Sequence, residues 1–305
     1  MDGFLAGDGW YKSRIPFEGS SVGFYGNDYR VLAELHIEYA DGSKEVLSTD
    51  ESWQVRRSNI TFSGIYDGEW QDETLPQGEV EAVAIATPLK GQLIDRLSVP
   101  VRTHEEFHPA LVSNDAGETI LDIGQNLAGI FTLRVHIPKG QRVHIQAGEL
   151  LQDGHFYRDN LRTAKAEFYY TSDGEEHIVR PHFTFYGFRY LKIEGIENFD
   201  PKDITVHALY SDTPMNSQLM TGHAKLNQFL SNVSWGMKSN FVDLPTDCPQ
   251  RDERMGWTGD SQVFSETACF LAQPYAFYRK YLYDMEQEQK NADGCAPDFV
   301  PAVTC

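Results

Sequence analysis

The residues best suited to chemistry are concentrated between Asp243 and Asp260, a stretch that reads DLPTDCPQRDERMGWTGD. It holds five carboxylic acids, one thiol, two arginines and one tryptophan, and folding alone does not require so much charge around a tryptophan. The stretch lies between two helical patterns, so we expect a loop. Loops on rigid scaffolds are where binding and catalytic residues collect.

Glu253 is the carboxyl that we single out as a candidate proton donor. Asp252 lies beside it, and Asp247 and Asp260 flank it in the sequence. Neighbouring carboxylates raise the pKa of a carboxyl and guanidinium groups lower it, and an acid catalyst at neutral pH needs the first effect or burial to dominate. Trp257 offers an apolar face on which a sugar ring could pack. Paired carboxyls, an arginine and an aromatic platform are the parts that a glycosidase assembles.

Three other interpretations of this loop stay open at this point. A dense acidic loop is often a solvated surface or an ion-pair network. Asp247, Asp252 and Asp260 could supply oxygen ligands to a divalent metal ion, although their spacing lacks the regularity of an EF-hand. Cys248 could act as a nucleophile, but the loop contains no histidine to activate it. His223, on the preceding helical pattern, is expected to be a surface or capping residue. We expect neither a metal ion nor a cofactor.

Composition limits the classes of protein to consider. A chain of 305 residues is long enough for two or three domains, and 41% hydrophobic with 23% charged residues is ordinary for a globular protein. The net charge of −19 is spread along the chain and repels phosphate backbones, so nucleic acid is not expected as a partner. No stretch approaches the roughly 18 consecutive apolar residues of a membrane span.

The termini and cysteines add little. Residues 1–10 have neither the basic nor the apolar region of a signal peptide, which favours a cytoplasmic location. The cysteines form no C-x-x-C pair, so structural zinc and a disulfide framework are not expected. They are Cys248, Cys269, Cys295 and Cys305.

The first two thirds of the chain have β-strand patterns. Apolar residues alternate with polar ones over residues 31–39, the pattern of a half-buried strand, and Asp41-Gly42 then turns the chain into a second run at 46–47. Residues 131–137, the turn Pro138-Lys139-Gly140 and residues 143–147 predict a second hairpin. An aromatic-rich strand is expected over 183–193, with Asp173-Gly174 as an earlier turn. Many short strands with such turns favour antiparallel sandwiches.

Helical spacing replaces the strand pattern after Pro214. One helix is expected from Asn216 onward and includes Leu226 and Met237, and a second is expected to be N-capped by Asp260 or Ser261. Pro274 stands near the start of a third helix. Three helices cannot enclose the core of an all-α domain, so we expect the chain to be part of a longer protein.

The stretch 243–260 closely resembles the signature of bacterial α-L-rhamnosidases of glycoside hydrolase family 78, D-x-P-T-D-C-P-Q-R-D-E-R-x-G-W-T-G-D, with Met255 at the variable position. The resemblance extends upstream. GWY (9–11), EYADGSKEVLSTDESW (38–53) and IYDGE (65–69) resemble the family's N-terminal β-sandwich. ILDIGQNLAG (120–129), GELLQDG (148–154), NLRTA (160–164) and FTFYGFRY (183–190) resemble its concanavalin-like sandwich.

This resemblance implies a multidomain chain: antiparallel β-sandwiches followed by the first helices of a truncated (α/α)6 barrel. The implied divisions are a partial N-terminal sandwich at 1–88, a concanavalin-like sandwich at 89–213 and the start of the catalytic barrel at 214–305. The looser of the two boundaries falls near residues 87–92. The implied partners are rhamnose-containing glycosides or polysaccharides.

The resemblance also implies roles for individual residues. Glu253 corresponds to the general acid, and Asp247, Arg251, Trp257 and Asp260 correspond to residues that bind rhamnose. The family inverts configuration, so a second carboxylate is needed roughly 6.5–9.5 Å from the acid. In the family this base is a glutamate much farther along the barrel, and we expect it beyond Cys305. Asp247 and Asp260 are the local substitutes.

Two hypotheses from other classes compete with an enzyme. The chain could be a non-catalytic carbohydrate-binding module whose exposed aromatic rings hold a glycan, or a structural fragment whose helices dock on a partner carrying the rest of the barrel. The aromatic candidates are Trp10, Tyr11, Trp53, Trp70, Tyr157 and Tyr186.

Overall fold

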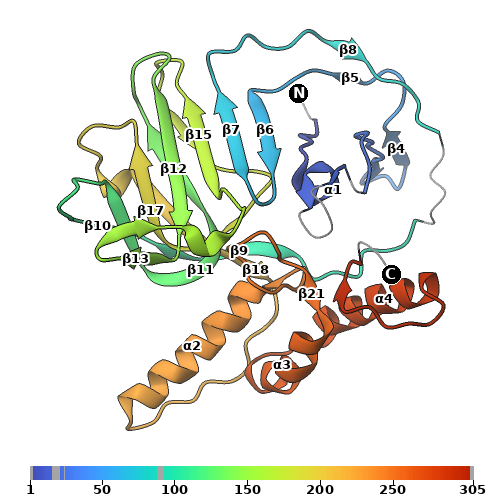
Figure 1. Ribbon diagram of the computed structural model, residues 1–305. Coiled ribbons are helices and arrows are strands. Elements are labelled where there is room, and N and C mark those ends of the chain that lie inside the picture. The colour runs from blue at the N-terminus through green and yellow to red at the C-terminus, as the bar shows by residue number, and fades with distance from the viewer. Residues whose placement is uncertain (1–2, 16–20, 24, 88–92, 303–305) are drawn as a thin grey trace.

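The computed structural model describes residues 3–15, 21–23, 25–87 and 93–302. Ten of its strands form one large sheet. Three long helices, α2 (Ala224–Asn240), α3 (Thr258–Leu271) and α4 (Tyr275–Asn291), lie together below that sheet in the view of Figure 1. Within the described residues, no helix is long and apolar enough to cross a membrane. Apart from Thr87, the expected boundary near 87–92 lies outside the described residues.

The large sheet has the strand order β6-β7-β15-β12-β17-β11-β18-β9, with β10 and β16 also paired to β11. Its strands are β6 (Ile60–Gly64), β7 (Gly68–Asp72), β9 (Val101–Phe107), β10 (Ala110–Val112), β11 (Ile120–Val135), β12 (Arg142–Gly148), β15 (Glu167–Thr171), β16 (His177–Val179), β17 (Tyr186–Glu194) and β18 (Ile204–Ser211).

The shorter elements are α1 (Gly9–Lys12), β1 (Arg14–Ile15), β2 (Ser21–Val22), β3 (Glu34–Glu38), β4 (Lys44–Ser48), β5 (Gln54–Val55), β8 (Glu81–Ala82), β13 (Leu150–Gln152), β14 (His155–Tyr157), η1 (Asp159–Leu161), η2 (Pro201–Asp203), β19 (Phe241–Val242), β20 (Leu244–Pro245), β21 (Gly256–Trp257) and β22 (Phe299–Val300).

Strand β11 pairs with four other strands of the large sheet. Along one edge it pairs first with β17 and then with β16, and along the other first with β10 and then with β18, all antiparallel. Its register with β17 shifts between Asp122 and Leu127, where Gly124 takes a φ of +80° that favours glycine. The expectation of antiparallel sheets is therefore largely confirmed. The exception is β7, which runs parallel to β15 and brings residues 68–72 into this sheet.

The two expected hairpins fare differently. Strands β3 and β4 pair across the Asp41-Gly42 turn, as expected, but Leu35 and Val46 stay exposed because no described element packs on them. The hairpin expected over 131–147 is wrong. Strands form at both places, but β17 lies between β11 and β12 and pairs with both. Its side chains Phe188 and Leu191 are fully buried, so this strand contributes to the core from the middle of the sheet.

One apolar core joins three regions of the chain. Phe131, Phe168 and Phe188 are buried at its centre, and the first two meet edge to face with ring centroids 5.4 Å apart. Tyr186 is also core, with 1% of its surface exposed, so it is not the exposed glycan platform that a binding module would need. Val242, which follows α2, belongs to the same core, so the helical region is anchored on the sandwich.

The helices begin at different residues from those expected. α2 begins only at Ala224, where His223 accepts a hydrogen bond from the Leu226 amide and so caps the helix, the role expected for it. α3 begins at Thr258 rather than after Asp260 or Ser261, because the Thr258 amide donates to the Asp298 carbonyl and that contact fixes the helix start. α4 begins after Pro274, as expected.

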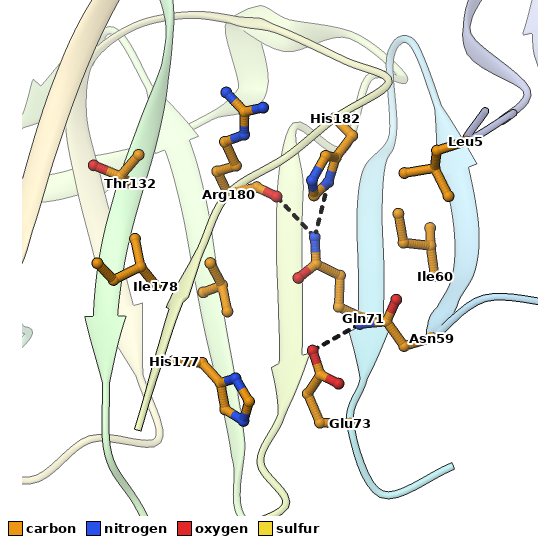
Figure 2. Close-up of a pocket in the computed structure, with 11 residues that line it drawn as sticks. Leu5, Asn59, Ile60, Gln71, Glu73, Thr132, His177, Ile178, Arg180 and His182 are labelled. Carbon is orange, nitrogen blue, oxygen red and sulfur yellow. Dashed lines mark hydrogen bonds between the residues drawn. The ribbon is translucent and has the colours of Figure 1, made fainter. Parts of the chain in front are cut away.

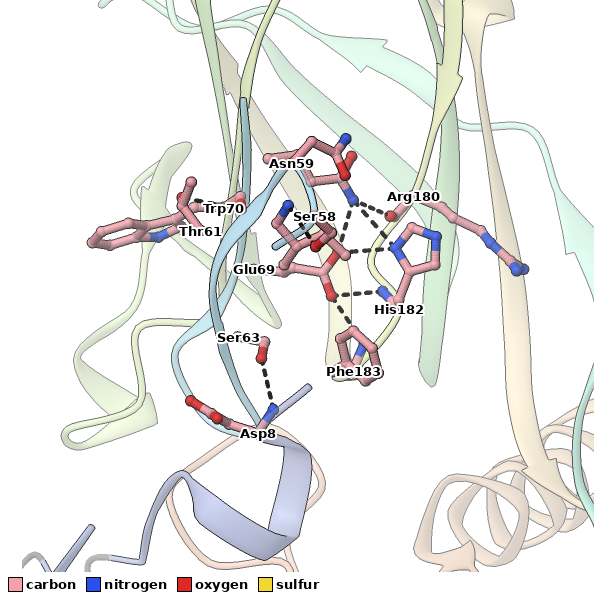
Figure 3. Close-up of polar contacts among 12 residues, drawn as sticks. Asp8, Ser58, Asn59, Thr61, Ser63, Glu69, Trp70, Arg180, His182 and Phe183 are labelled. Atoms are coloured by element: carbon pink, nitrogen blue, oxygen red, sulfur yellow. Dashed lines mark hydrogen bonds and ion pairs between the residues drawn. The ribbon is translucent and has the colours of Figure 1, made fainter. Parts of the chain in front are cut away.

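A buried carboxylate ties β7 to the segment that precedes β17 (Figure 3). Glu69 is fully buried and accepts hydrogen bonds from the backbone amides of His182 at 2.8 Å and Phe183 at 2.9 Å. Gln71 Nε2 and His182 Nδ1 also contact its carboxyl, at 2.7 and 3.0 Å. Each lone pair therefore replaces a lost contact with water, which is the condition for burying a charge.

Replacing Glu69 by alanine should therefore destabilise the fold. The change leaves the backbone amides of His182 and Phe183 and the Gln71 side chain without this acceptor, and we expect the free energy of unfolding to fall by about 3 kcal/mol. Urea unfolding followed by tryptophan fluorescence measures this loss. The exposed Glu176→Ala is the matched control, with an expected change below about 0.5 kcal/mol. Equal midpoints for the two variants would contradict this role of Glu69.

Candidate active site

The acid-rich loop is closed on itself by its own backbone. It runs from β20 to β21, and its two ends meet where the Asp247 amide donates to the Met255 carbonyl at 2.9 Å and the Arg254 amide donates to the Asp247 carbonyl at 3.0 Å. Cys248 and Arg254 have φ values of +52° and +61°, a region that non-glycine residues rarely adopt. Such strain persists only where surrounding contacts enforce it, and it is common at functional sites.

Arg254 supplies much of that enforcement. Its side chain is fully buried, and Nη1 donates to the backbone carbonyls of Ile65 and Phe185, each at 2.8 Å. The guanidinium carbon lies 4.7 Å from the ring centre of Phe185 and 5.5 Å from that of Tyr66. Burial, partly offset by nearby phenol and carboxyl groups, lowers the pKa of Arg254 to about 10. The loop is thus fastened to the β6–β7 turn and to the start of β17.

Two further contacts seat the loop on the sandwich. The Tyr66 hydroxyl donates to the Glu253 carbonyl at 2.9 Å. Gly187 faces the loop so closely that an added Cβ would lie 2.7 Å from the Gln250 amide nitrogen, which explains the glycine in β17. The loop therefore has little freedom to shift against the sandwich.

Two guanidinium groups hold the Glu253 carboxyl. Arg251 Nε donates to Oε2 at 2.8 Å, and Arg162 Nη2 contacts the same oxygen. Only 7% of the Glu253 side chain is exposed. The neighbouring Asp252 carboxyl is equally buried and lies between Arg162 Nε, at 3.0 Å, and the Thr163 hydroxyl, which donates to it. The ion-pair network that was one interpretation of this loop exists, and it includes residues of the sandwich.

Asp247 and Glu253 form a carboxyl pair. Burial raises the pKa of Asp247, as do its hydrogen bond with Glu253 and the negative charges of Glu253 and Asp260, while the Cys248 thiol partly opposes these effects. Arg251 Nη2 lies 3.8 Å from Asp247 Oδ2. The close Glu253 carboxyl therefore helps Asp247 to keep its proton to a higher pH than a lone aspartate would.

Cys248 is poorly suited to either chemistry considered for it. Burial and the hydrogen bond to Asp247 raise the pKa of the thiol to about 12, so it stays protonated near neutral pH and is a weak nucleophile and a weak metal ligand. Its sulfur and one oxygen each of Asp247 and Glu253 lie within 4.8 Å of one another, but both carboxyls already face Arg251. The oxygen set considered for a divalent ion is not assembled either, because Asp252 pairs with Arg162.

Trp257 and Asp260 lie just after the loop. Trp257 ends β21, and its ring packs on Phe299 of β22 with centroids 5.0 Å apart. Asp260 is exposed in the first turn of α3, where a negative charge is favourable, and its charge reaches Asp247. The structure therefore brings Asp247, Arg251 and Glu253 into contact, with these two residues following them on β21 and α3.

Sequence reasoning missed the part of the site that the sandwich contributes. Arg162 and Thr163 reach the loop from the motif NLRTA, and Glu149, from the motif GELLQDG, faces the positive charge of Arg251. Asn126 and Asn160 each donate to the Glu149 carboxyl at 2.9 Å, while burial raises its pKa. The motifs themselves were the only sequence signal for these contacts.

A separate hollow of about 490 Å³ lies beside Gln71 of β7 (Figure 2). Asn59, Gln71, Arg180 and His182 are among the residues that line it, and Gln71 donates to the Arg180 carbonyl across its wall at 2.7 Å. None of the expected site residues lines this hollow. The candidate active site is therefore the loop and not this cavity.

Comparison with known families accounts for almost the whole chain. Residues 3–105 match the α-L-rhamnosidase N-terminal domain, residues 113–210 the bacterial α-L-rhamnosidase concanavalin-like domain, and residues 214–304 the bacterial α-L-rhamnosidase 6 hairpin glycosidase domain. These domains and the acid-rich loop place the chain in the class of glycoside hydrolases. Within that class, the chain belongs to the bacterial α-L-rhamnosidase family. Its sheets and helices fit β-sandwiches followed by the first helices of an (α/α)6 barrel, the expected fold class.

Individual relatives agree. An α-L-rhamnosidase of Alteromonas sp. (strain LOR) is 33% identical over 99% of this chain and 34% of its own length. The crystal structure of native α-L-rhamnosidase from Aspergillus terreus matches 97% of this chain and 36% of its own with a TM-score of 0.89 and 33% identity. That of Streptomyces avermitilis α-L-rhamnosidase complexed with L-rhamnose matches 97% of this chain and 30% of its own, with a TM-score of 0.88 and 32% identity. The chain spans about a third of the length of these relatives.

The raised pKa of Asp247 makes a prediction about stability and pH. A carboxyl whose pKa is raised by folding stabilises the fold below its unfolded pKa, about 3.9, and loses that contribution as the pH rises through the folded value. Asp247→Asn removes this loss, so the variant should melt higher than wild type at pH 7, and the difference should shrink toward pH 3.5. Melting temperatures across that range measure it, with the exposed Asp153→Asn as control. A difference that is constant with pH, or reversed, contradicts the assignment.

Removing the Arg254 guanidinium should loosen the loop as well as the fold. Arg254→Met keeps the volume but removes both hydrogen bonds from Nη1, and the Thr184 hydroxyl stays as the side-chain donor to the Ile65 and Phe185 carbonyls. We therefore expect a loss of about 2 kcal/mol and faster proteolysis within residues 246–255. Urea unfolding and limited proteolysis with mapped cleavage sites measure both effects. Arg279→Met, on the exposed face of α4, should change neither. Unchanged proteolysis of the Arg254 variant would show that other contacts hold the loop.

Proposed function

We propose that the protein containing this chain hydrolyses terminal α-L-rhamnosides with inversion of configuration, and that Glu253 is the proton donor. The observation that carries this proposal is the Asp247–Glu253 pair. The Glu253 side chain is only 7% exposed, Arg162 and Arg251 hold its carboxyl, and the pKa of the neighbouring Asp247 is raised. A buried carboxyl held in a fixed position beside a second carboxyl is the arrangement that protonation of a leaving sugar oxygen requires.

The remaining site residues fit the binding of a sugar. Arg251 orients both members of the carboxyl pair, Trp257 supplies an aromatic surface, and Asp260 adds an exposed carboxylate that accepts hydroxyl hydrogen bonds. The relative from Streptomyces avermitilis was crystallised in complex with L-rhamnose. We assign Asp247, Arg251, Trp257 and Asp260 to rhamnose binding, and rhamnose-bearing glycosides or polysaccharides as the substrates.

An inverting hydrolase also needs a carboxylate that activates water on the opposite face of the sugar, roughly 6.5–9.5 Å from the acid. Asp247 touches Glu253 and is too close for that role. Asp260, the other local substitute, matches a sugar-binding position of the family, as Asp247 does. The family resemblance implies a glutamate farther along the barrel as the base, and we assign the base to such a residue after Cys305. In this arrangement the loop supplies the acid and the sugar contacts, and a later part of the hairpin domain supplies the base that activates water.

Substituting Glu253 tests the function directly. In the full-length protein, Glu253→Gln should lower kcat on an unactivated aryl α-L-rhamnoside by about 10²–10⁴-fold, because the amide has no proton to transfer. L-Rhamnose should bind nearly as before, since the shape of the site is kept. Glu197→Gln, an exposed change on the sandwich, is the control.

The reaction itself needs a separate readout. Proton NMR of the first-formed rhamnose should show the β-anomer, the inverted product. A wild-type protein without rhamnosidase activity would overturn the proposal, and a near-normal kcat for Glu253→Gln would remove this residue from the acid role.

A further inference from the structure

Arg162 reaches the proposed proton donor from the sandwich, 91 residues away in the chain. It follows the short helix η1 and has a φ of +56°, which a residue other than glycine adopts at a cost. This backbone conformation turns its side chain to the loop, where Nε lies 3.0 Å from Asp252 Oδ1 and Nη2 contacts Glu253 Oε2. One guanidinium therefore spans two consecutive carboxyls.

The far side of this contact is fixed to the rest of the fold. Thr163 donates to the other oxygen of Asp252, and Arg14 Nη2 donates to the Thr163 carbonyl at 2.7 Å. Arg14 in turn pairs with both oxygens of Asp67 at 2.8 Å. A series of ion pairs and hydrogen bonds thus links Asp67 of the β6–β7 turn, through Arg14 and Thr163, to Asp252 and Arg162. Asp252 connects this series of contacts to Arg162, because its carboxyl faces both Thr163 and the Arg162 guanidinium.

One oxygen of the Glu253 carboxyl contacts two guanidinium groups. Oε2 accepts Arg251 Nε at 2.8 Å and also faces Arg162 Nη2. An oxygen that faces two N–H donors has no room for a hydrogen of its own, so the proton of the neutral acid must be on Oε1. When that proton moves to the glycosidic oxygen, the C–O bond electrons go to the leaving oxygen, and the new negative charge on Glu253 lies directly against Arg162.

We propose that Arg162 is a positioning residue for the proton donor: it holds Oε2 of Glu253, directs the proton-bearing Oε1 to the leaving group, and stabilises the carboxylate that forms. This inference rests on the proposed function. It gives the concanavalin-like domain a part in the chemical step, because preorganised charge is effective when it faces charge that develops in the transition state.

The dependence of the rate on the leaving group tests this role. A 2,4-dinitrophenyl α-L-rhamnoside leaves as a stable phenolate and needs little acid assistance, whereas an unsubstituted phenyl α-L-rhamnoside needs it fully. In the full-length protein, Arg162→Met should lower kcat on the phenyl substrate by roughly 10²-fold and on the dinitrophenyl substrate by less than about threefold. KM and the affinity for L-rhamnose should stay close to wild type.

Two further variants sharpen the comparison. Arg162→Lys keeps a cation of shorter reach, so its loss on the phenyl substrate should be smaller than that of Arg162→Met. Arg134→Met, on an exposed position of β11, should leave both substrates unaffected. If Arg162→Met does not fold, the same leaving-group comparison on Arg162→Lys decides the matter.

Each failure has its own signature. Equal losses on both substrates, or a raised KM with unchanged kcat, would show that Arg162 acts only in folding or binding and would overturn the inference. If Glu253→Gln shows strong leaving-group dependence and the Arg162 variants show none, the inference fails while the proposed function stands. If Glu253→Gln lacks that dependence, or wild type hydrolyses neither substrate, the proposed function itself fails.

Discussion

Arg254 places a permanent positive charge where no water reaches it, and the arrangement of the loop follows from how that charge is satisfied. Nη1 donates to the carbonyls of Ile65 and Phe185, and aromatic rings cover the guanidinium faces, while Nε and Nη2 are buried without a hydrogen-bond partner among the described residues. Burying a guanidinium without such partners is prohibitive. Its partners all belong to the sheet-rich part of the chain, so the loop keeps its shape only while it is seated on the sandwich.

The burial of Arg254 also affects the directions in which the neighbouring side chains of Asp252 and Glu253 point. Arg254 points into the sandwich, while Asp252 and Glu253 turn to Arg162 instead. Because the acceptors of Arg254 are neutral carbonyls, both carboxyls remain available to other cations. The positive φ at Arg254 is the local cost of sending consecutive side chains to different partners. The backbone strain at Arg254, its buried charge and the orientation of Asp252 and Glu253 therefore depend on one another.

Local sequence patterns predicted where strands and helices form better than they predicted which strands pair with each other. The turn Asp41-Gly42 is a local signal, and the hairpin of β3 and β4 follows it, as α4 follows Pro274. The pairing of β11 with β17 depends on which strand occupies the centre of the sheet, and adjacency along the chain does not report that. The start of α3 likewise depends on Asp298, forty residues farther on, and not on a capping side chain nearby.

In the candidate site, too, the contacts within one loop could be predicted from the sequence and the long-range contacts could not. Glu253, Asp247 and Arg251 could be found together because they lie in one loop, and their chemistry is local. Arg162 could not be found this way, since nothing in the types of two residues so far apart predicts that they meet. Yet a proton donor with charges only from its own loop would lack the cation that the sandwich places on Oε2. The proposed acid and Arg251 lie in one motif, but the second cation on Oε2, Arg162, reaches that oxygen only through the tertiary fold.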